Sequence, residues 1–156
     1  MKTYIGVDLG TSGVKVLAVD INGKILAEAT ESYPVSRPKE GWSEQNPEEW
    51  YAATLRALRR LNVKEAAGLS FGGQMHGLVI LDKDDNVIRP CILWNDGRSE
   101  SEAEYLNSLP VAEYTGNMAF AGFTAPKMLW LKNNEPQNFA RIAKIMLPKD
   151  YLVYRL

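Results

Sequence analysis

The chain lacks the features that would tie it to a disulfide framework, to nucleic acid or to a membrane. Cys91 is the only cysteine, which excludes an internal disulfide and any zinc site built on cysteines, and it fits a reducing compartment. Lysine and arginine number 18 against 19 acidic residues, so the formal charge of −1 gives no reason to expect nucleic acid or an anionic membrane. No apolar run is long enough to cross a bilayer, and no hydrophobic signal segment follows Met1. We therefore expect a small-molecule partner and a cytoplasmic location, with neither nucleic acid nor a membrane as partner.

Two common phosphate-binding motifs are also missing. The chain contains neither the Walker sequence G-x-x-x-x-G-K-[ST] nor the dinucleotide fingerprint G-x-G-x-x-G. A nucleotide would therefore need another kind of cradle for its phosphates.

The stretch from Gly6 to Lys15 predicts such a cradle. Apolar residues before Asp8 are typical of a buried strand, and glycines after it let backbone N–H groups turn toward an anion without interference from a Cβ atom. Asp8 can hold a hydrated Mg²⁺ that neutralises a polyphosphate, which makes it a catalytic metal anchor and not a base. The expected phosphate-binding residues are Gly10, Thr11, Ser12 and Lys15. An ordinary hairpin, with Gly10 and Gly13 present only for positive φ, is the alternative.

The length of the chain fits a single domain, and its turn and capping signals predict an α/β fold. Strands over 14–19 and from 24 to about 33, joined by an Asn22-Gly23 turn, complete a three-stranded antiparallel meander. Asn46 and Pro47 begin a helix that runs to about residue 61. The apolar residues on its expected inner face are Tyr51, Leu55, Leu58 and Leu61.

The second half of the chain alternates short strands and helices. A strand over 66–71 should deliver the loop 72–77 to the carboxyl edge of the sheet. The segments 78–81 and 87–94 are typical of a hairpin, although Pro90 places part of it at an edge. Helices are expected over 99–109, after a Thr124 cap with Met128, Leu129 and Leu131 inward, and over 136–143 and 149–156.

One loop combines side chains that suit a sugar. His76, the only histidine, lies beside Met75 and follows Gln74, whose amide can both donate and accept hydrogen bonds. A neutral imidazole offers one donor and one acceptor, which matches adjacent sugar hydroxyls. A purely structural hydrogen-bonding role is the alternative.

A second loop pairs an aromatic face with short polar groups, the usual way to hold the C–H surface and the hydroxyls of a sugar. Trp94 supplies the aromatic face, and Asp96 follows it. The alternative is that Trp94 lies in the core and that the loop is a plain turn, with Arg98 bridging to a neighbouring carboxylate. Trp42, Trp50 and Trp130 are expected to be packing residues.

The stretch Gly6–Lys15 resembles the first phosphate-binding hairpin of the superfamily that contains sugar kinases, hexokinase, Hsp70 and actin. Four further blocks stand in the order seen in FGGY-type carbohydrate kinases, and the likeness runs over residues 1–156 and is greatest to the xylulokinases in that family. The blocks are Trp42-Ser43-Glu44-Gln45-Asn46-Pro47, Gly73-Gln74-Met75-His76-Gly77, Leu93-Trp94-Asn95-Asp96-Gly97-Arg98 and Gly122-Phe123-Thr124-Ala125-Pro126-Lys127.

The resemblance implies a ribonuclease-H-like α/β fold of the actin type, a mixed sheet with flanking helices. It implies ATP-dependent phosphorylation of D-xylulose at its terminal hydroxyl, with ATP and Mg²⁺ as cofactors. The residues that it places in the sugar site are Gln74, Met75, His76, Trp94 and Asp96. The alternatives are another FGGY substrate (ribulose, glycerol, gluconate or a deoxyketose) and a non-catalytic sugar-binding or regulatory protein. Glycerol is disfavoured because glycerol kinases carry an Arg-Glu pair in the Gln-Met-His loop.

The end of the sequence predicts an incomplete domain. The last helix-like segment stops at Leu156 without a cap, a glycine or a polar tail, and FGGY kinases continue through the rest of this domain and a second one. We therefore expect residues 1–156 to be part of an N-terminal kinase domain that is inactive alone, because the acceptor-side aspartate of the family stands in a later glycine-rich motif. Apolar surface left uncovered would favour self-association, so a homo-oligomer is expected.

Overall fold

The computed structural model describes residues 2–156, which form two compact units. The first unit consists of the residues up to Val35, Pro47–Gln74 and Pro148–Leu156, and the second of Ser36–Asn46 and Met75–Leu147. Each unit is thus assembled from separate stretches of the chain. Over the described part of the sequence, no helix combines the length and the apolar character needed to span a bilayer.

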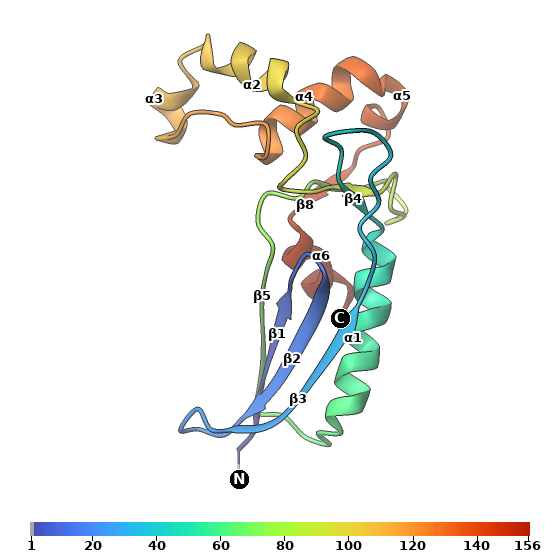
Figure 1. The fold of residues 1–156 in the computed structure, drawn as a ribbon, viewed down its shortest axis with the longest axis vertical. Helices are drawn as coiled ribbons and strands as arrows, with labels where there is room; N and C mark the ends of the chain where they lie inside the picture. The colour runs from blue at the N-terminus through green and yellow to red at the C-terminus, as the bar shows by residue number, and fades with distance from the viewer. Residues whose placement is uncertain (1) are drawn as a thin grey trace. The chain divides into compact units, whose positions relative to one another are not determined.

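A four-stranded mixed sheet forms the first unit (Figure 1). Its strands, in the order β3-β2-β1-β5, are β1 (Tyr4–Leu9), β2 (Gly13–Val19), β3 (Ile25–Ser32) and β5 (Gly68–Gly73). Its helices are α1 (Pro47–Leu61) and α6 (Pro148–Arg155). The first three strands pair antiparallel, which confirms the predicted meander, and β5 lies parallel to β1. The carboxyl ends of β1 and β5 therefore share one edge of the sheet.

Helix α1 packs on β2 and β3, and its buried face combines small side chains with Trp50 and Leu61. Ala53 and Ala57 are fully buried, whereas Tyr51, Leu55 and Leu58 are partly exposed. Leu61 is buried as predicted, but the other three predicted residues lie at the edge of the buried face. Alanine lets the helix backbone lie close to the sheet, and the larger residues fill the flanks of this contact.

Helix α6 is tied to α1 by hydrogen bonds and an aromatic contact. The Tyr151 hydroxyl donates to the Glu48 carboxylate over 2.6 Å, and Arg155 donates to the same carboxylate. The Arg155 guanidinium also lies over the Tyr51 ring, 4.4 Å from its centroid. Glu48 and Tyr151 are 103 residues apart in the sequence.

The second unit contains two small antiparallel ladders, in which β4 pairs with β7 and β6 with β8. Its strands are β4 (Glu44–Gln45), β6 (Val79–Leu81), β7 (Cys91–Ile92) and β8 (Lys144–Met146). Its helices are α2 (Glu100–Asn107), α3 (Val111–Thr115), α4 (Thr124–Asn134) and α5 (Pro136–Phe139). The helix α3 was not predicted.

The predicted pairing of 78–81 with 87–94 is confirmed as an antiparallel but irregular hairpin. Antiparallel bridges join Leu81 to Val87 and Leu78 to Ile92, and the Ile88 N–H donates to the Ile80 carbonyl over 3.1 Å. Pro90 interrupts the second segment because it has no N–H to donate. The distant strands β4 and β8 provide the regular pairing instead.

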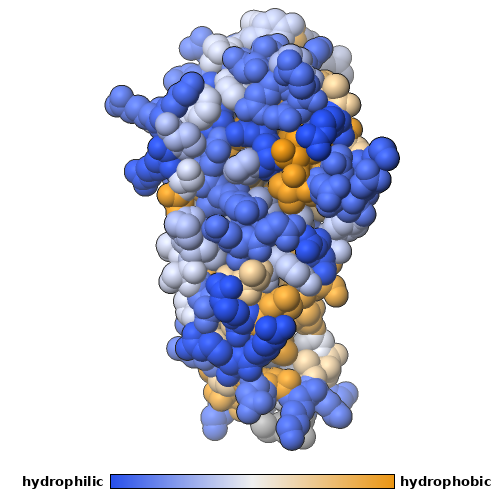
Figure 2. Space-filling model, turned by 90° about the vertical axis from the view of Figure 1, so that its right-hand side faces the viewer, coloured by the Kyte–Doolittle hydropathy of each residue, from blue (hydrophilic) through white to orange (hydrophobic). Residues whose placement is uncertain are grey.

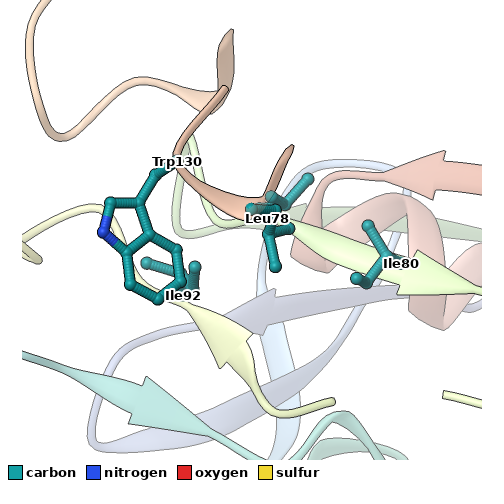
Figure 3. Close-up of a cluster of buried hydrophobic side chains, with 5 residues drawn as sticks. Leu78, Ile80, Ile92 and Trp130 are labelled. Atoms are coloured by element: carbon teal, nitrogen blue, oxygen red, sulfur yellow. The ribbon is translucent and has the colours of Figure 1, made fainter. Parts of the chain in front are cut away.

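The core of the second unit gathers around Trp130. The cluster consists of Leu78, Ile80, Ile92, Trp130 and Leu131, and Figure 3 labels four of these residues. Trp42 packs against it, with its ring edge-on to Trp130 at 5.4 Å. In the first unit Trp50 is fully buried, so all three tryptophans expected to be packing residues are confirmed. On the face that Figure 2 views, hydrophobic surface occurs in separate patches among hydrophilic side chains.

Gly73→Ala should destabilise the protein more than Gly72→Ala. A Cβ atom at Gly73 would lie 2.8 Å from Leu9 Cβ and 2.9 Å from the Leu9 carbonyl oxygen, whereas a Cβ atom at Gly72 meets nothing within 4 Å. We expect Gly73→Ala to lower the free energy of unfolding by about 1–3 kcal/mol, the usual cost of overpacking. Urea denaturation of the two matched variants checks this, and equal losses would contradict the close contact of β1 with β5.

Candidate functional site

The turn between β1 and β2 borders an open hollow beside Asp8. The Asp8 side chain is exposed, and its register partners are Lys15 on β2 and Gly72 on β5. The hollow has a volume of about 230 Å³ and is lined by Asp8, Gly10, Ser12, Gly13, Lys15, Thr30 and Ser32. The structure thus brings Asp8 together with three of the four predicted phosphate-binding residues, and Thr11 lies in the same turn.

Close approach of the backbone explains the glycines of this turn. Neither Gly10 nor Gly13 has a positive φ, so the alternative that rests on positive φ is wrong. A Cβ atom on Gly13 would lie 2.7 Å from the Glu31 carbonyl oxygen, and one on Gly10 would lie 3.0 Å from the Gly13 carbonyl oxygen. The Gly10 N–H donates to that Gly13 oxygen over 3.0 Å. The Gly10 N–H is therefore engaged within the turn, and the side chains that line the hollow are hydroxyls, the Asp8 carboxylate and Lys15.

Tyr33 fixes the turn from the end of β3. Its hydroxyl donates to the Gly10 carbonyl over 2.6 Å, and its N–H donates to the Ser12 carbonyl over 3.3 Å. Burial, and then the negative charge of Asp8, raise the pKa of the Tyr33 hydroxyl well above its ordinary value, so it stays a neutral donor. No sequence pattern indicated this role, because it depends on the register that carries β3 past β2.

Gln74 also contacts the turn. Its N–H donates to the Leu9 carbonyl over 2.7 Å, and its side-chain oxygen accepts a hydrogen bond from the Thr11 hydroxyl over 3.3 Å. The structure therefore places this amide beside the predicted phosphate site. A contact between Gln74 and a sugar stays a prediction.

The donor set at Asp8 suits Mg²⁺ held largely by water. Within residues 2–156, no group of three or more histidine, cysteine, aspartate or glutamate side chains is placed to hold a metal. Mg²⁺ keeps several waters and commonly binds through one or two carboxylates plus substrate phosphates, so a single exposed carboxylate fits. Lys15 pairs with Glu28 over 2.9 Å, and both side chains are about half exposed, so the pair is weak enough to be exchanged for an anion.

In the second unit, His76 has a left-handed backbone conformation with φ of 57°. Its ring stacks on Phe123, with centroids 4.3 Å apart and planes at 25°. Its carbonyl accepts hydrogen bonds from Lys127 Nζ over 2.9 Å and from Thr124 Oγ1 over 3.3 Å. Burial, and then the charge of Lys127, lower the pKa of the imidazole, so at pH 7 it is neutral with one donor and one acceptor.

The start of α4 differs from its prediction. Phe123 holds the N-cap position without a side-chain cap bond, and Thr124 is the first helical residue. Leu131 is fully buried as predicted, and Met128 is partly buried against the core of the second unit. Leu129 is only partly buried, whereas Lys127 is fully buried. In the sequence, the one signal for the burial of Lys127 was its place at the edge of an apolar helical run, and no role was predicted for this residue.

The Trp94 loop presents one accessible and one enclosed candidate. Trp94 is 46% exposed and Met75 61%, so a ligand can reach both side chains. Asp96 is 2% exposed, and its carboxylate accepts hydrogen bonds from the Arg98 N–H (2.9 Å), Arg98 Nε (2.8 Å), Arg98 Nη2 (2.7 Å) and the Ser43 N–H (2.6 Å). This is the turn with an Arg98 bridge that the alternative describes. A sugar contact by Asp96 stays a prediction.

Arg98 lies at the centre of a buried charge network. Its Nη1 is 2.7 Å from a Glu44 carboxylate oxygen, and Glu44 also pairs with Arg89. Arg89 in turn lies 3.3 Å from Glu135. The Arg98 guanidinium stacks over the Trp42 ring, 3.7 Å from its centroid. Desolvated charges of this kind are tolerated only when each has close partners, so the network holds the loop in one geometry.

Comparisons with known proteins give one consistent family. The sequence pattern described as the FGGY family of carbohydrate kinases, N-terminal domain, matches residues 3–156. The xylulose kinase of Escherichia coli K12 is 48% identical over 98% of this chain and 33% of its own length. A crystal structure of a xyloylose kinase from Brucella ovis is 47% identical with a TM-score of 0.96, and it matches 99% of this chain and 33% of that one. A gluconate kinase structure from Lactobacillus acidophilus is 31% identical with a TM-score of 0.90, over 99% and 33% of the two chains. The chain thus spans about a third of the length of these relatives.

Arg98→Met should destabilise the second unit strongly. The substitution leaves Asp96 and Glu44 buried without the guanidinium, and breaking a buried ion pair by removing one partner costs about 3–5 kcal/mol. Arg37→Met, at an exposed position, is the matched control and should change the free energy of unfolding little. Denaturation monitored by tryptophan fluorescence checks both, and a small loss for Arg98→Met would exclude the network as a structural support.

Proposed function

Because the chain belongs to the FGGY family of carbohydrate kinases, we propose that it supplies the part of an ATP-dependent kinase that holds the phosphates of ATP and one side of D-xylulose. The observation that carries the proposal is the exposed Asp8 carboxylate beside a hydroxyl-lined turn, in a chain of which 98% aligns with a xylulose kinase. Cytoplasmic location and homo-oligomerisation stay predictions from the sequence.

The nucleotide side of the proposal assigns Asp8 to Mg²⁺ and the turn to phosphate. Ser12 would donate its hydroxyl hydrogen to a phosphate oxygen. Thr11 would do the same by exchanging its bond to Gln74, and Lys15 would exchange Glu28 for phosphate. Bound Mg²⁺ would neutralise charge that develops on the transferred phosphoryl group. Tyr33 supports this arrangement by holding the Gly10 carbonyl, so that the turn is ordered before a nucleotide binds.

The sugar side of the proposal rests on accessible side chains of the second unit. His76 would exchange hydrogen bonds with adjacent hydroxyls, and Met75 and Trp94 would pack on the C–H surface of the sugar. The Asp96 carboxylate already accepts four hydrogen bonds, so its proposed part is to shape the loop that carries Trp94.

The likeness to a gluconate kinase makes an aldonic acid the second candidate substrate. Gluconate carries a carboxylate, which a site would bind best with an accessible cation. The proposed contact residues His76, Met75 and Trp94 bring no positive charge at pH 7, and Lys127 and Arg98 are enclosed by their own partners. A neutral ketose therefore fits these residues better.

The direct test is a chimera in which the chain replaces the matching third of the Escherichia coli xylulose kinase. The proposal expects ATP-dependent phosphorylation of D-xylulose in a coupled ADP-release assay, faster than that of D-gluconate or glycerol. The chain alone is expected to show no sugar-dependent ADP release. A chimera that folds but prefers gluconate would overturn the substrate, and one that binds neither sugar nor ATP would overturn the function.

Asp8→Asn in the chimera should lower kcat by orders of magnitude while leaving D-xylulose affinity within a few-fold. The amide removes the charge that anchors Mg²⁺ and so acts on phosphoryl transfer and not on sugar binding. Asp84→Asn, at an exposed turn position, is the control and should keep normal turnover. Near-normal kcat for Asp8→Asn would remove the metal-anchor role.

His76→Asn should weaken D-xylulose binding by roughly 1–3 kcal/mol, the typical cost of leaving desolvated polar groups unpaired. Asparagine tolerates the left-handed conformation better than alanine, so the change tests the imidazole with little added backbone strain. Calorimetric titration of the chimera at pH 7 measures the affinity. Unchanged binding would place His76 outside the sugar site.

A further inference from the structure

Lys127 is a buried lysine whose partners are backbone carbonyls. It is 0% exposed, and its Nζ donates to the His76 carbonyl over 2.9 Å and to the Gly122 carbonyl over 2.6 Å. Among the described residues no ion pair includes this ammonium. Burial lowers the pKa of Lys127 to about 8, although the negative charge of Asp96 raises it in part, a sign that the charge is held against its solvation preference. Burying an ammonium is costly unless it is hydrogen-bonded, and the two carbonyls supply such bonds.

What Lys127 fixes is the backbone of His76. A left-handed conformation is unfavourable for a residue with a Cβ atom and persists only where the surroundings determine it. Lys127 and Thr124 donate to the same His76 carbonyl, and the adjacent Phe123 stacks on the ring. The first turn of α4 therefore constrains both the main chain and the side chain of His76.

The second bond of Lys127 reaches the segment beside Trp94. A Cβ atom at Gly122 would collide with the Trp94 carbonyl oxygen, so only glycine allows this approach. Lys127 Nζ donates to the carbonyls of both Gly122 and His76. One ammonium therefore joins the segment at Gly122, which lies against Trp94, to the loop that carries His76.

We propose that Lys127 is a positioning residue that, with Thr124, holds His76 in the orientation needed to bind a sugar hydroxyl. The proposal rests on the proposed sugar site. It goes beyond that site because Lys127 would touch no substrate and would instead set the geometry of His76, which would.

Because His76 is the only histidine, its imidazole gives unambiguous NMR signals in the unmodified chain. Lys127→Met keeps the length of the side chain but removes the charge and the donors. We expect the His76 ring protons to lose the shift caused by the stacked Phe123 ring, and the imidazole pKa to rise because the neighbouring positive charge is gone. Lys132→Met, an exposed lysine of the same helix, is the matched control and should leave both unchanged.

The same variants in the chimera test the link to the sugar. Lys127→Met should raise the KM for D-xylulose at least ten-fold with a smaller effect on the KM for ATP, and Lys132→Met should change neither. His76 signals and sugar KM that both stay at wild-type values would overturn the proposal, even if the variant is less stable. If the His76 signals change in the unmodified chain but the chimera never binds sugar, the proposed function is overturned while the positioning of His76 is upheld.

If Lys127→Met does not fold, Thr124 decides the question. Thr124→Val removes one donor to the His76 carbonyl at nearly constant volume, and Thr124→Ser restores the hydroxyl. We expect a partial change of the His76 ring signals in the valine variant and recovery in the serine variant. Identical wild-type signals in both would overturn the proposal.

Discussion

The parallel pairing of β1 with β5 decides where the candidate residues of the first unit lie. Because parallel strands end at the same edge, Asp8 at the end of one strand and Gln74 after the other meet beside a single turn. The pairing is tight at Gly73, where a larger side chain would meet Leu9. The hydrogen bond between Thr11 and Gln74 then follows from the register. The proposed phosphate site is thus a product of strand order more than of any single side chain.

The loops of the second unit are instead held by buried charges that pair with one another. Arg98 satisfies Asp96 and Glu44 at once, and its guanidinium stacks on Trp42. Such a network adds little net stability compared with an apolar core, but it admits few alternative arrangements because each unpaired charge would be costly. Lys127 follows the same logic with carbonyl partners. Rigid loops of this kind suit sugars, whose hydroxyls are distinguished by direction more than by charge.

Several local signals in the sequence predicted local structure correctly, although α3 and the start of α4 were not among them, and contacts between distant segments were not predictable from such signals. The Asn22-Gly23 turn and Pro47 predicted the meander and the start of α1, because turn geometry and capping depend on a few neighbouring residues. The inner face of α1 was only partly predicted, since Leu61 is buried but the sheet accepts Ala53 and Ala57 where larger apolar residues were expected. The roles of Tyr33 and Lys127 were missed because each bonds to a carbonyl that only the folded chain brings near. Every residue has a backbone carbonyl, so the sequence does not indicate which carbonyl a side chain will bond.

The link between α6 and α1 has a consequence for the order of folding. The meander and α1 use contacts between neighbouring segments, whereas Tyr151 reaches Glu48 across 103 residues of chain. Closing so long a loop costs conformational entropy before any contact repays it, so we expect α6 to dock after the sheet has formed. Interactions made after the rate-limiting step slow unfolding more than they speed folding. The contacts of Glu48 with Tyr151 and Arg155 would then lengthen the lifetime of the folded first unit.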